Sequence, residues 1–237
     1  MSDDIEFVQI YGERNSGTNY LDRLLRRNVT VEPDRVLGST SQDKNPYGHV
    51  FGFKHWFIDE DRLQDPRADR TLFIAIFRHP LFWLRSMAQR PYQAVNHVGL
   101  PMDAFLREEW YAEEHGREMM RERNPQTGRR FGNVLELRSA KVRDFLDLRT
   151  KVRHYRCVRY EDIMFGGESF LSDIAGTYPG LLKQPLGATP RKKDRAHLWL
   201  KVQRQKLEIR RLLSRQDRNF VRRQLDMSAE RQLGYRV

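Results

Sequence analysis

The segment GERNSGTN, residues 12–19, follows an apolar stretch and has the composition of a loop that binds a phosphate group. A nucleoside-triphosphate loop has the pattern GxxxxGK[ST], in which backbone N–H groups surround the phosphates, the lysine reaches the terminal phosphates and the hydroxyl holds magnesium. Gly12 and Gly17 keep the spacing of that pattern, but Thr18 and Asn19 occupy its last two positions. The segment therefore predicts an anion-binding loop without the ATP-binding lysine, or else an ordinary tight turn.

Three more groups of polar residues follow apolar stretches and are candidates for the same chemistry. They are Lys54-His55, Arg78 with Ser86 eight residues later, and the tripeptide Tyr160-Glu161-Asp162. An arginine and a hydroxyl suit a second phosphate, and a neutral imidazole suits proton abstraction near pH 7. Each group also has a purely structural interpretation, as an ion-pair partner, an ordinary strand-end histidine, or a core aromatic followed by helix-capping acids.

The hydrophobic pattern predicts the strands that position these groups. Runs of β-branched and aromatic residues predict strands at 5–11, 49–57, 71–77 and 152–160. The run 71–77 lacks alternation, which is typical of a central parallel strand covered on both faces. The polar stretch 33–47 predicts a loop.

Helical segments are predicted between and after these strands. They lie at 21–27, from Pro80 onward, at 102–123, at 139–148, from Gly167 to about Tyr178, and in the basic region near the C-terminus. Strands that alternate with helices predict an α/β fold, with a central, mainly parallel sheet flanked by helices in three layers. Functional residues are then expected at the carboxyl ends of the strands.

The length and composition predict one soluble domain. The 237 residues contain 39% apolar and 32% charged residues, and we expect a single domain, 1–237, with a helical insertion at about 91–148 and a basic helical C-terminal region at about 191–225. No apolar stretch has the length of a membrane span. The only cysteine, Cys157, makes no internal disulfide and excludes a cysteine-built metal site. We therefore expect a cytoplasmic protein with no membrane association.

Positive charge is concentrated near the C-terminus. The formal net charge is +11, and the segment from Arg191 to Arg223 contains thirteen Lys or Arg residues against three acids. Such a concentration favours a polyanion or a multiply phosphorylated ligand, because it raises the local concentration of anions. A solvated helix face is the structural alternative.

The order and spacing of these groups resemble the sulfotransferases that use 3′-phosphoadenosine 5′-phosphosulfate (PAPS). That family has a [KR]-x-SGT-type loop after its first strand, a lysine/histidine motif, an arginine with a serine eight residues on, a Tyr-Glu-Asp stretch and a basic Arg-Lys motif. The matching residues here are, in that order, Arg14, Asn15, Ser16, Gly17, Thr18 and Asn19, then Lys54 and His55, then Arg78 and Ser86, then Tyr160, then Arg191 and Lys192. The matched segments are short and lie between residues 5 and 200, and the stretch 91–148 shows no correspondence.

The resemblance implies a P-loop-like fold and the transfer of a sulfuryl group from PAPS to a hydroxyl or amine of a small-molecule or glycan acceptor, with adenosine 3′,5′-bisphosphate (PAP) as the product. It implies that the loop 14–19 holds the 5′-phosphosulfate and that Arg78 and Ser86 hold the 3′-phosphate. Tyr160 would stack on the adenine, and Arg191-Lys192 would close over the 3′-phosphate. No metal is implied.

Two positions differ from the family pattern. The lysine that directly precedes Ser-Gly-Thr in many members is Asn15 here, so either Arg14 or Asn15 faces the leaving oxygen. The family's lysine and histidine are separated by one residue, whereas Lys54 and His55 are adjacent and would point to opposite faces of a regular strand. Either His55 is the general base, or Lys54 faces the donor and the base lies elsewhere.

Two other classes of function compete with this interpretation. A P-loop nucleotide kinase or NTPase would require ATP and magnesium. The missing lysine argues against this class, because the γ-phosphoryl group of ATP carries dense negative charge that the lysine helps to neutralise, whereas a sulfuryl group brings less charge. A nucleic-acid-binding module built on the basic C-terminal region would show affinity that falls steeply with salt. No base-reading motif with interleaved aromatic residues supports a nucleic-acid partner, and the oligomeric state does not follow from the sequence.

Overall fold

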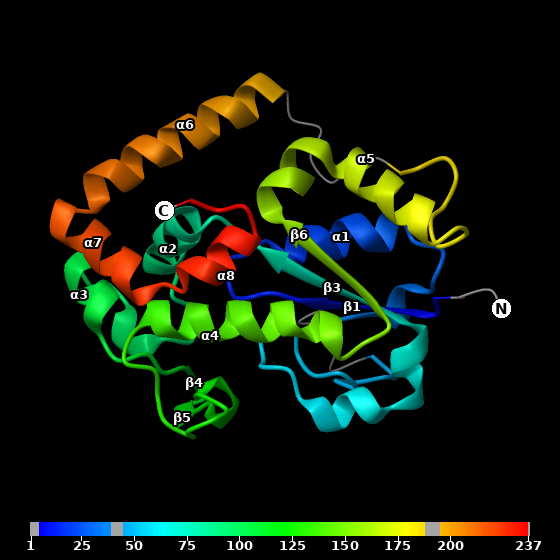
Figure 1. Ribbon diagram of the computed structural model, residues 1–237, viewed down its shortest axis with the longest axis horizontal. Coiled ribbons are helices and arrows are strands. Elements are labelled where there is room, and N and C mark those ends of the chain that lie inside the picture. Colours follow the sequence, from blue (N-terminus) through cyan, green and yellow to red (C-terminus); the bar gives the residue numbers. More distant parts are fainter. Residues whose placement is uncertain (1–4, 39–44, 188–194, 237) are drawn as a thin grey trace. The chain divides into compact units, whose positions relative to one another are not determined.

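The structure is a computed structural model that describes residues 5–38, 45–187 and 195–236 (Figure 1). The chain forms two compact units. The first unit contains Met1–Arg78 and Phe145–Arg195, and the second contains His79–Asp144 and Ala196–Val237. The second unit is therefore built largely from a segment inserted between two strands of the first.

The first unit is organised around a four-stranded parallel sheet. Its strands are β1 (Phe7–Tyr11), β2 (Val36–Leu37), β3 (Thr71–Phe77) and β6 (His154–Arg159), in the order β2-β1-β3-β6. This arrangement confirms the predicted α/β fold with a central parallel sheet flanked by helices. The strand β2 lies inside the polar stretch 33–47 that was expected to be a loop, and its two residues are too few to give a pattern.

The strand β3 is the centre of this unit. All seven of its residues are buried, and it pairs with β1 on one side and β6 on the other, as its continuous apolar sequence predicts. One face of the sheet packs against the helices α1 (Thr18–Asn28) and α5 (Tyr160–Thr177), through Leu21, Leu24, Ile163, Leu171 and Ile174. The predicted helix after Gly167 is this α5, which begins at Tyr160 and is kinked at Gly166.

The opposite face of the sheet is covered by aromatic rings. Tyr11 stacks on Phe73 and Phe145, with ring centroids 6.4 and 5.7 Å apart. Phe51 meets Phe73 edge-on at 5.0 Å, and the Tyr11 hydroxyl donates a hydrogen bond to the Phe51 carbonyl. These contacts attach the segment around Phe51 to the sheet without making it a strand.

The strand predicted at 49–57 is wrong, because this segment forms consecutive turns. Gly48 and Gly52 adopt positive φ angles of 52° and 93°, which extended strands do not contain. Turn hydrogen bonds join Gly52 N–H to the His49 carbonyl and Trp56 N–H to the Phe53 carbonyl, both at 2.9 Å. The aromatic residues that suggested a strand pack against one another instead.

The second unit begins with α2 (Pro80–Gln89), whose start at Pro80 confirms the prediction. The helix predicted at 102–123 is wrong beyond α3 (Met102–Arg107). The chain then forms a small hairpin of β4 (Glu113–Glu114) and β5 (Arg117–Glu118), and the residues between the strands, His115 and Gly116, have φ angles of 52° and 72°. Positive φ at both central residues is the signature of a tight hairpin turn.

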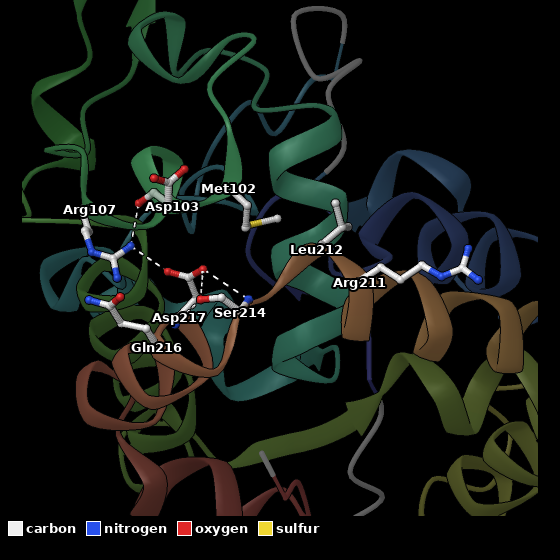
Figure 2. Close-up of a pocket in the computed structure, with 8 residues that line it drawn as sticks. All are labelled: Met102, Asp103, Arg107, Arg211, Leu212, Ser214, Gln216 and Asp217. Atoms are coloured by element: carbon white, nitrogen blue, oxygen red, sulfur yellow. Dashed lines mark hydrogen bonds and ion pairs between the residues drawn. The ribbon is translucent and has the colours of Figure 1, made fainter.

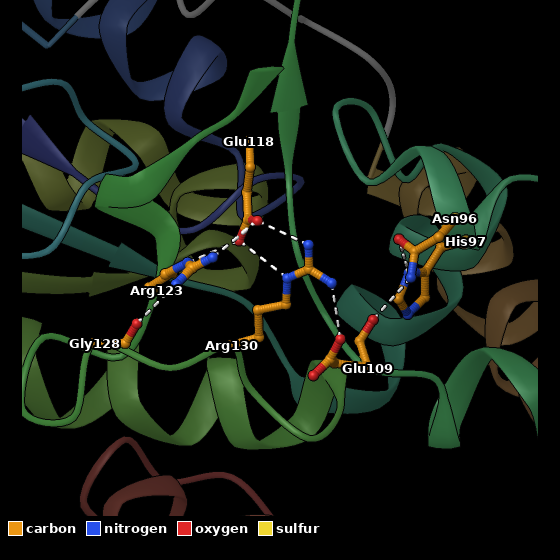
Figure 3. A network of polar contacts seen from close by, with 7 residues as sticks. All are labelled: Asn96, His97, Glu109, Glu118, Arg123, Gly128 and Arg130. Atoms are coloured by element: carbon orange, nitrogen blue, oxygen red, sulfur yellow. Dashed lines mark hydrogen bonds and ion pairs between the residues drawn. The ribbon is translucent and has the colours of Figure 1, made fainter. Parts of the chain in front are cut away.

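Charged side chains cross-link this hairpin to the chain that follows it (Figure 3). The Glu118 carboxylate accepts hydrogen bonds from both Arg123 and Arg130 at 2.8–3.1 Å, which lowers its pKa to about 2. Arg130 also pairs with Glu109 at 3.0 Å and lies over the Tyr111 ring. The charged residues of the segment that was predicted to be helical therefore hold an irregular segment together.

A buried ion pair joins two of the remaining helices of the second unit. Arg138 on α4 (Val134–Asp147) donates to the Glu230 carboxylate at 2.6 and 3.0 Å, with both side chains almost completely buried. The helix α4 starts five residues earlier than the predicted 139–148, because the Asn133 side chain accepts the N–H groups of Leu135 and Glu136. Such a cap satisfies N–H groups that the helix itself leaves unpaired.

The described part of the basic C-terminal region forms two helices, and a third follows it. They are α6 (Arg195–Leu212), α7 (Arg215–Gln224) and α8 (Met227–Gln232). The helix α7 begins with a capping box between Ser214 and Asp217, which separates it from α6. This local pattern was not used in the prediction of a single helical region. Among the described residues, no helix is both long and apolar enough to cross a membrane.

Candidate anion-binding site

The loop between β1 and α1 ends at an uncapped helix N-terminus. Gly17 is the N-cap residue of α1, has a φ of 104° and makes no side-chain capping hydrogen bond. The first N–H groups of a helix have no acceptor within the helix, and the helix dipole places partial positive charge there. The loop from Gly12 to Thr18 therefore ends at a helix N-terminus, which is a favourable position for an anion.

Ser16 supplies a hydroxyl inside this loop. Its side chain is 2% exposed, and its Oγ makes no hydrogen bond within the part of the chain that the structure describes. A Cβ atom added to Gly12 would lie 2.7 Å from this Oγ and 2.7 Å from the Ile76 carbonyl, so the close packing at the base of the loop requires glycine at this position. A buried hydroxyl costs free energy unless it is hydrogen-bonded, and a phosphate or sulfate oxygen would satisfy it.

Arg14 lies inside the loop rather than at its surface. It is 2% exposed, its N–H donates to Glu13 Oε1 at 2.6 Å and its Nη1 is 3.4 Å from the same oxygen. Glu13 was not predicted as a site residue, because only its position between Gly12 and Arg14 marks it in the sequence. Its carboxylate holds Arg14 and offsets the guanidinium charge within the loop.

Arg78 joins this loop to the next strand. Its Nη1 donates a hydrogen bond to the Asn15 carbonyl at 3.0 Å, and Asn15 itself has a φ of 62°. The guanidinium carbon also lies 5.1 Å from the centre of the Tyr160 ring. The residues that follow β1, β3 and β6 are thus in contact, as expected for carboxyl ends of neighbouring parallel strands.

The sheet order explains why a ligand site belongs at this point. From β1 the chain continues to β2 on one side of the sheet, whereas from β3 it continues to β6 on the other side. Ligands of open parallel sheets bind in the crevice where connections diverge in this way, outside the carboxyl ends of the strands. Asn15 and Arg78 lie on the two sides of that point.

Lys54 and His55 reach the loop from the turns that replace the predicted strand. Lys54 is 1% exposed, and its Nζ donates to Asn19 Oδ1 in the first turn of α1 at 2.6 Å. Gly12 is held twice, because its N–H donates to the Lys54 carbonyl at 2.9 Å and its carbonyl lies 2.5 Å from His55 Nδ1. Both side chains are therefore beside the loop, which a regular strand would have prevented.

The contact with Gly12 fixes the tautomer of His55. A carbonyl oxygen only accepts hydrogen bonds, so Nδ1 must carry the proton. In a neutral imidazole the lone pair is then on Nε2. His55 is consequently oriented by the same loop that would hold the anion, with Nε2 as its basic atom.

The buried Lys54 ammonium has an unusual proton affinity. Burial lowers its pKa from 10.5 to about 8, while Asp22 raises it and Arg26 lowers it. At a pH between about 8 and 10.5, Lys54 is protonated more often in the unfolded chain than in the folded protein. This group therefore makes the free energy of unfolding rise with pH. An anion in the loop would restore the charged form.

A Lys54→Met variant tests this pKa. We expect its stability relative to wild type to be greatest near pH 7 and to decline by about 3 kcal/mol as the pH rises to 10.5, because only the wild type loses a buried charge. Urea denaturation at several pH values measures the difference. Replacement of the exposed Lys183 by methionine is the control, and a Lys54→Met difference that is independent of pH would contradict the assignment.

Among the other predicted residues, Thr18 belongs to the loop and Ser86 to the second unit. Ser86 is half-buried on α2 and belongs to the second unit. Arg191 and Lys192 lie outside the described residues. Thr18 is buried at the start of α1, next to Asn19. The first unit thus brings together the loop, Lys54-His55, Arg78 and Tyr160.

The second unit contains a pocket of about 600 Å³ (Figure 2). It is lined by residues of α3, the end of α6 and the start of α7. Arg107 donates to Asp217 at 2.9 Å, and Asp217 is also bound by Ser214 in the capping box. The Asp217 carboxylate at the N-terminus of α7 is therefore already paired with Arg107 and Ser214. In the described parts of the chain, no three His, Cys, Asp or Glu side chains are grouped as metal ligands.

Comparisons with models of protein families and with curated proteins found no match for this chain.

Proposed function

We propose that this protein is a PAPS-dependent sulfotransferase with a P-loop-like fold, which transfers a sulfuryl group to a hydroxyl or amine of a small-molecule or glycan acceptor. The observation that carries the proposal is the contact of Arg78 with Asn15 and Tyr160. The guanidinium follows the strand next to the one that leads into the uncapped N-terminus of α1, and this arrangement supports a donor with two separate anionic groups. A bound donor supplies the sulfuryl group.

The loop supports this chemistry better than it supports triphosphate hydrolysis. The lysine position of the triphosphate-binding pattern is the buried Thr18, and the nearby ammonium is that of Lys54, which reaches the loop from another segment. Backbone N–H groups and one ammonium suffice to stabilise the single negative charge that develops on a leaving phosphate. A Mg²⁺-bound triphosphate carries a denser charge.

His55 acts as the general base in this proposal. Its Nε2 takes the proton of the acceptor while the acceptor oxygen or nitrogen attacks sulfur, and the bond between sulfur and the oxygen of the 5′-phosphate breaks. The electron pair of that bond goes to the leaving PAP. Lys54 and the N–H groups of Gly17 and Thr18 stabilise the leaving oxygen. Arg14 is held within the loop by its contacts with Glu13.

Calorimetric titration tests the proposal. We expect the wild type to bind PAP and not to bind ATP with magnesium, and we expect Arg78→Ala to weaken PAP binding about 100-fold, because a charge-assisted hydrogen bond to phosphate is lost. Binding of ATP with magnesium but not of PAP would favour a nucleotide kinase or NTPase and overturn the proposal.

The matched control for this titration is Arg67→Ala. Arg67 precedes β3, at the amino end of the same strand, and forms a surface ion pair with Asp65. Its loss should leave PAP affinity unchanged. Equal losses in Arg67→Ala and Arg78→Ala would mean that PAP responds to total charge and not to this site.

A further inference from the structure

The aromatic ring of Tyr160 contacts both halves of the candidate site. A Cβ atom added to Gly17 would lie 2.2 Å from Cδ2 of this ring, so the ring rests directly on the loop. The Arg78 guanidinium carbon lies 5.1 Å from the ring centre, within the range of a cation–π interaction. We infer that Tyr160 is a positioning residue, which holds the Arg78 guanidinium against the loop for the second anionic group of the ligand.

The sheet register brings the two residues together. Phe77 of β3 pairs with Arg159 of β6, so Arg78 and Tyr160 are the next residues on adjacent parallel strands. Tyr160 begins α5 immediately after β6, which fixes the direction of its side chain. Its ring is also met edge-on by Tyr20 of α1, with ring centroids 6.1 Å apart.

Positioning by an aromatic face has a clear physical benefit for an arginine. A free arginine side chain has many rotamers, and ordering it on binding costs free energy. The Tyr160 ring and the Asn15 carbonyl restrict the guanidinium before any ligand arrives. The planar guanidinium can stack on a ring and still donate from its edge.

The ring and not the hydroxyl carries this role. Within the described part of the chain, the Tyr160 hydroxyl makes no hydrogen bond, whereas the ring meets Gly17, Tyr20 and Arg78. Phenylalanine should therefore replace Tyr160 without loss. This role differs from stacking on the adenine, in which Tyr160 would touch the ligand directly and would act independently of Arg78.

A double-mutant cycle separates the two roles, with PAP as the probe, and it rests on the proposed function. We expect Tyr160→Phe to bind PAP as the wild type does and Tyr160→Leu to bind about tenfold more weakly. In an Arg78→Ala background, Tyr160→Leu should cause no further loss, because the residue through which it acts is absent. Equal tenfold losses in both backgrounds would overturn the inference and indicate direct contact with the ligand.

An NMR measurement without ligand makes the inference independent of PAP. The Nε–H resonance of Arg78, assigned from its absence in Arg78→Lys, should carry a ring-current shift that Tyr160→Phe keeps and Tyr160→Leu loses. A resonance that does not respond to Tyr160→Leu would overturn the positioning role. If the wild type fails to bind PAP while the ring-current result holds, the proposed function fails and the Tyr160–Arg78 contact stands.

Discussion

A His55→Gln variant is expected to bind PAP as tightly as the wild type and to transfer sulfuryl groups roughly 100- to 10,000-fold more slowly, the usual contribution of a general base. The reason is the geometry of the ring: Nδ1 is bound to the Gly12 carbonyl at 2.5 Å, so Nε2 is the atom that accepts the proton. Glutamine keeps a donor for Gly12 but has no basic nitrogen. The effect should appear in kcat, because His55 meets the acceptor's proton only during the reaction.

Release of PAP from PAPS in the presence of phenols, alcohols and amines measures this reaction. The control is His49→Gln, because His49 belongs to the same aromatic cluster as Phe53 and Trp56 and has no role in the proposed reaction. A His55→Gln enzyme with wild-type turnover would remove His55 from the mechanism. A loss of PAP affinity equal to the loss of turnover would show that His55 only supports the loop.

A Gly17→Ala variant is expected to lose PAP binding by at least 100-fold and about 2–4 kcal/mol of stability. Gly17 has a φ of 104°, which residues with a Cβ rarely adopt. The added methyl group would also lie 2.2 Å from the Tyr160 ring, so the ring, Arg78 or the loop must move. Titration with PAP and urea denaturation measure the two effects.

Gly180→Ala isolates the strain from the steric clash. Gly180 has a φ of 87°, but no atom lies within 4 Å of an added Cβ, so this variant should lose stability by about 1 kcal/mol and keep PAP affinity. The double variant Gly17→Ala/Tyr160→Ala should recover part of the stability lost in Gly17→Ala. If Gly17→Ala binds PAP as the wild type does, the loop is not the anion site.

The strands β1 and β3 could be predicted from the sequence because they are largely apolar, and β6 could be predicted from its β-branched and aromatic residues, although it also carries arginines. Burial on both faces of a parallel sheet imposes that composition directly, and all residues of β1 and β3 are buried. The segment 49–57 has a similar composition for a different reason. Its rings pack on one another and on Phe73 across turns that depend on positive φ at Gly48 and Gly52, and apolar content alone does not distinguish the two cases.

Several residues of the candidate site, but not Glu13, were predictable from the sequence, whereas their contacts were not. The glycine spacing of the loop, Lys54-His55 and Arg78 are visible in the sequence, because each follows or precedes a recognisable apolar segment. The bond from Arg78 to the Asn15 carbonyl and the packing of Tyr160 on Gly17 depend on the register of three strands. Register is a long-range property, and single residues carry little information about it.

The connection between β3 and β6 has a consequence for the way the chain folds. These neighbouring strands are separated in sequence by the whole of His79–Asp144. During synthesis one edge of β3 therefore stays unpaired until β6 has been made. Contacts between distant segments form slowly, and an unpaired apolar edge invites association with other chains. The contact between Arg78 and Tyr160 therefore forms only after β6 has paired with β3 across this long insertion.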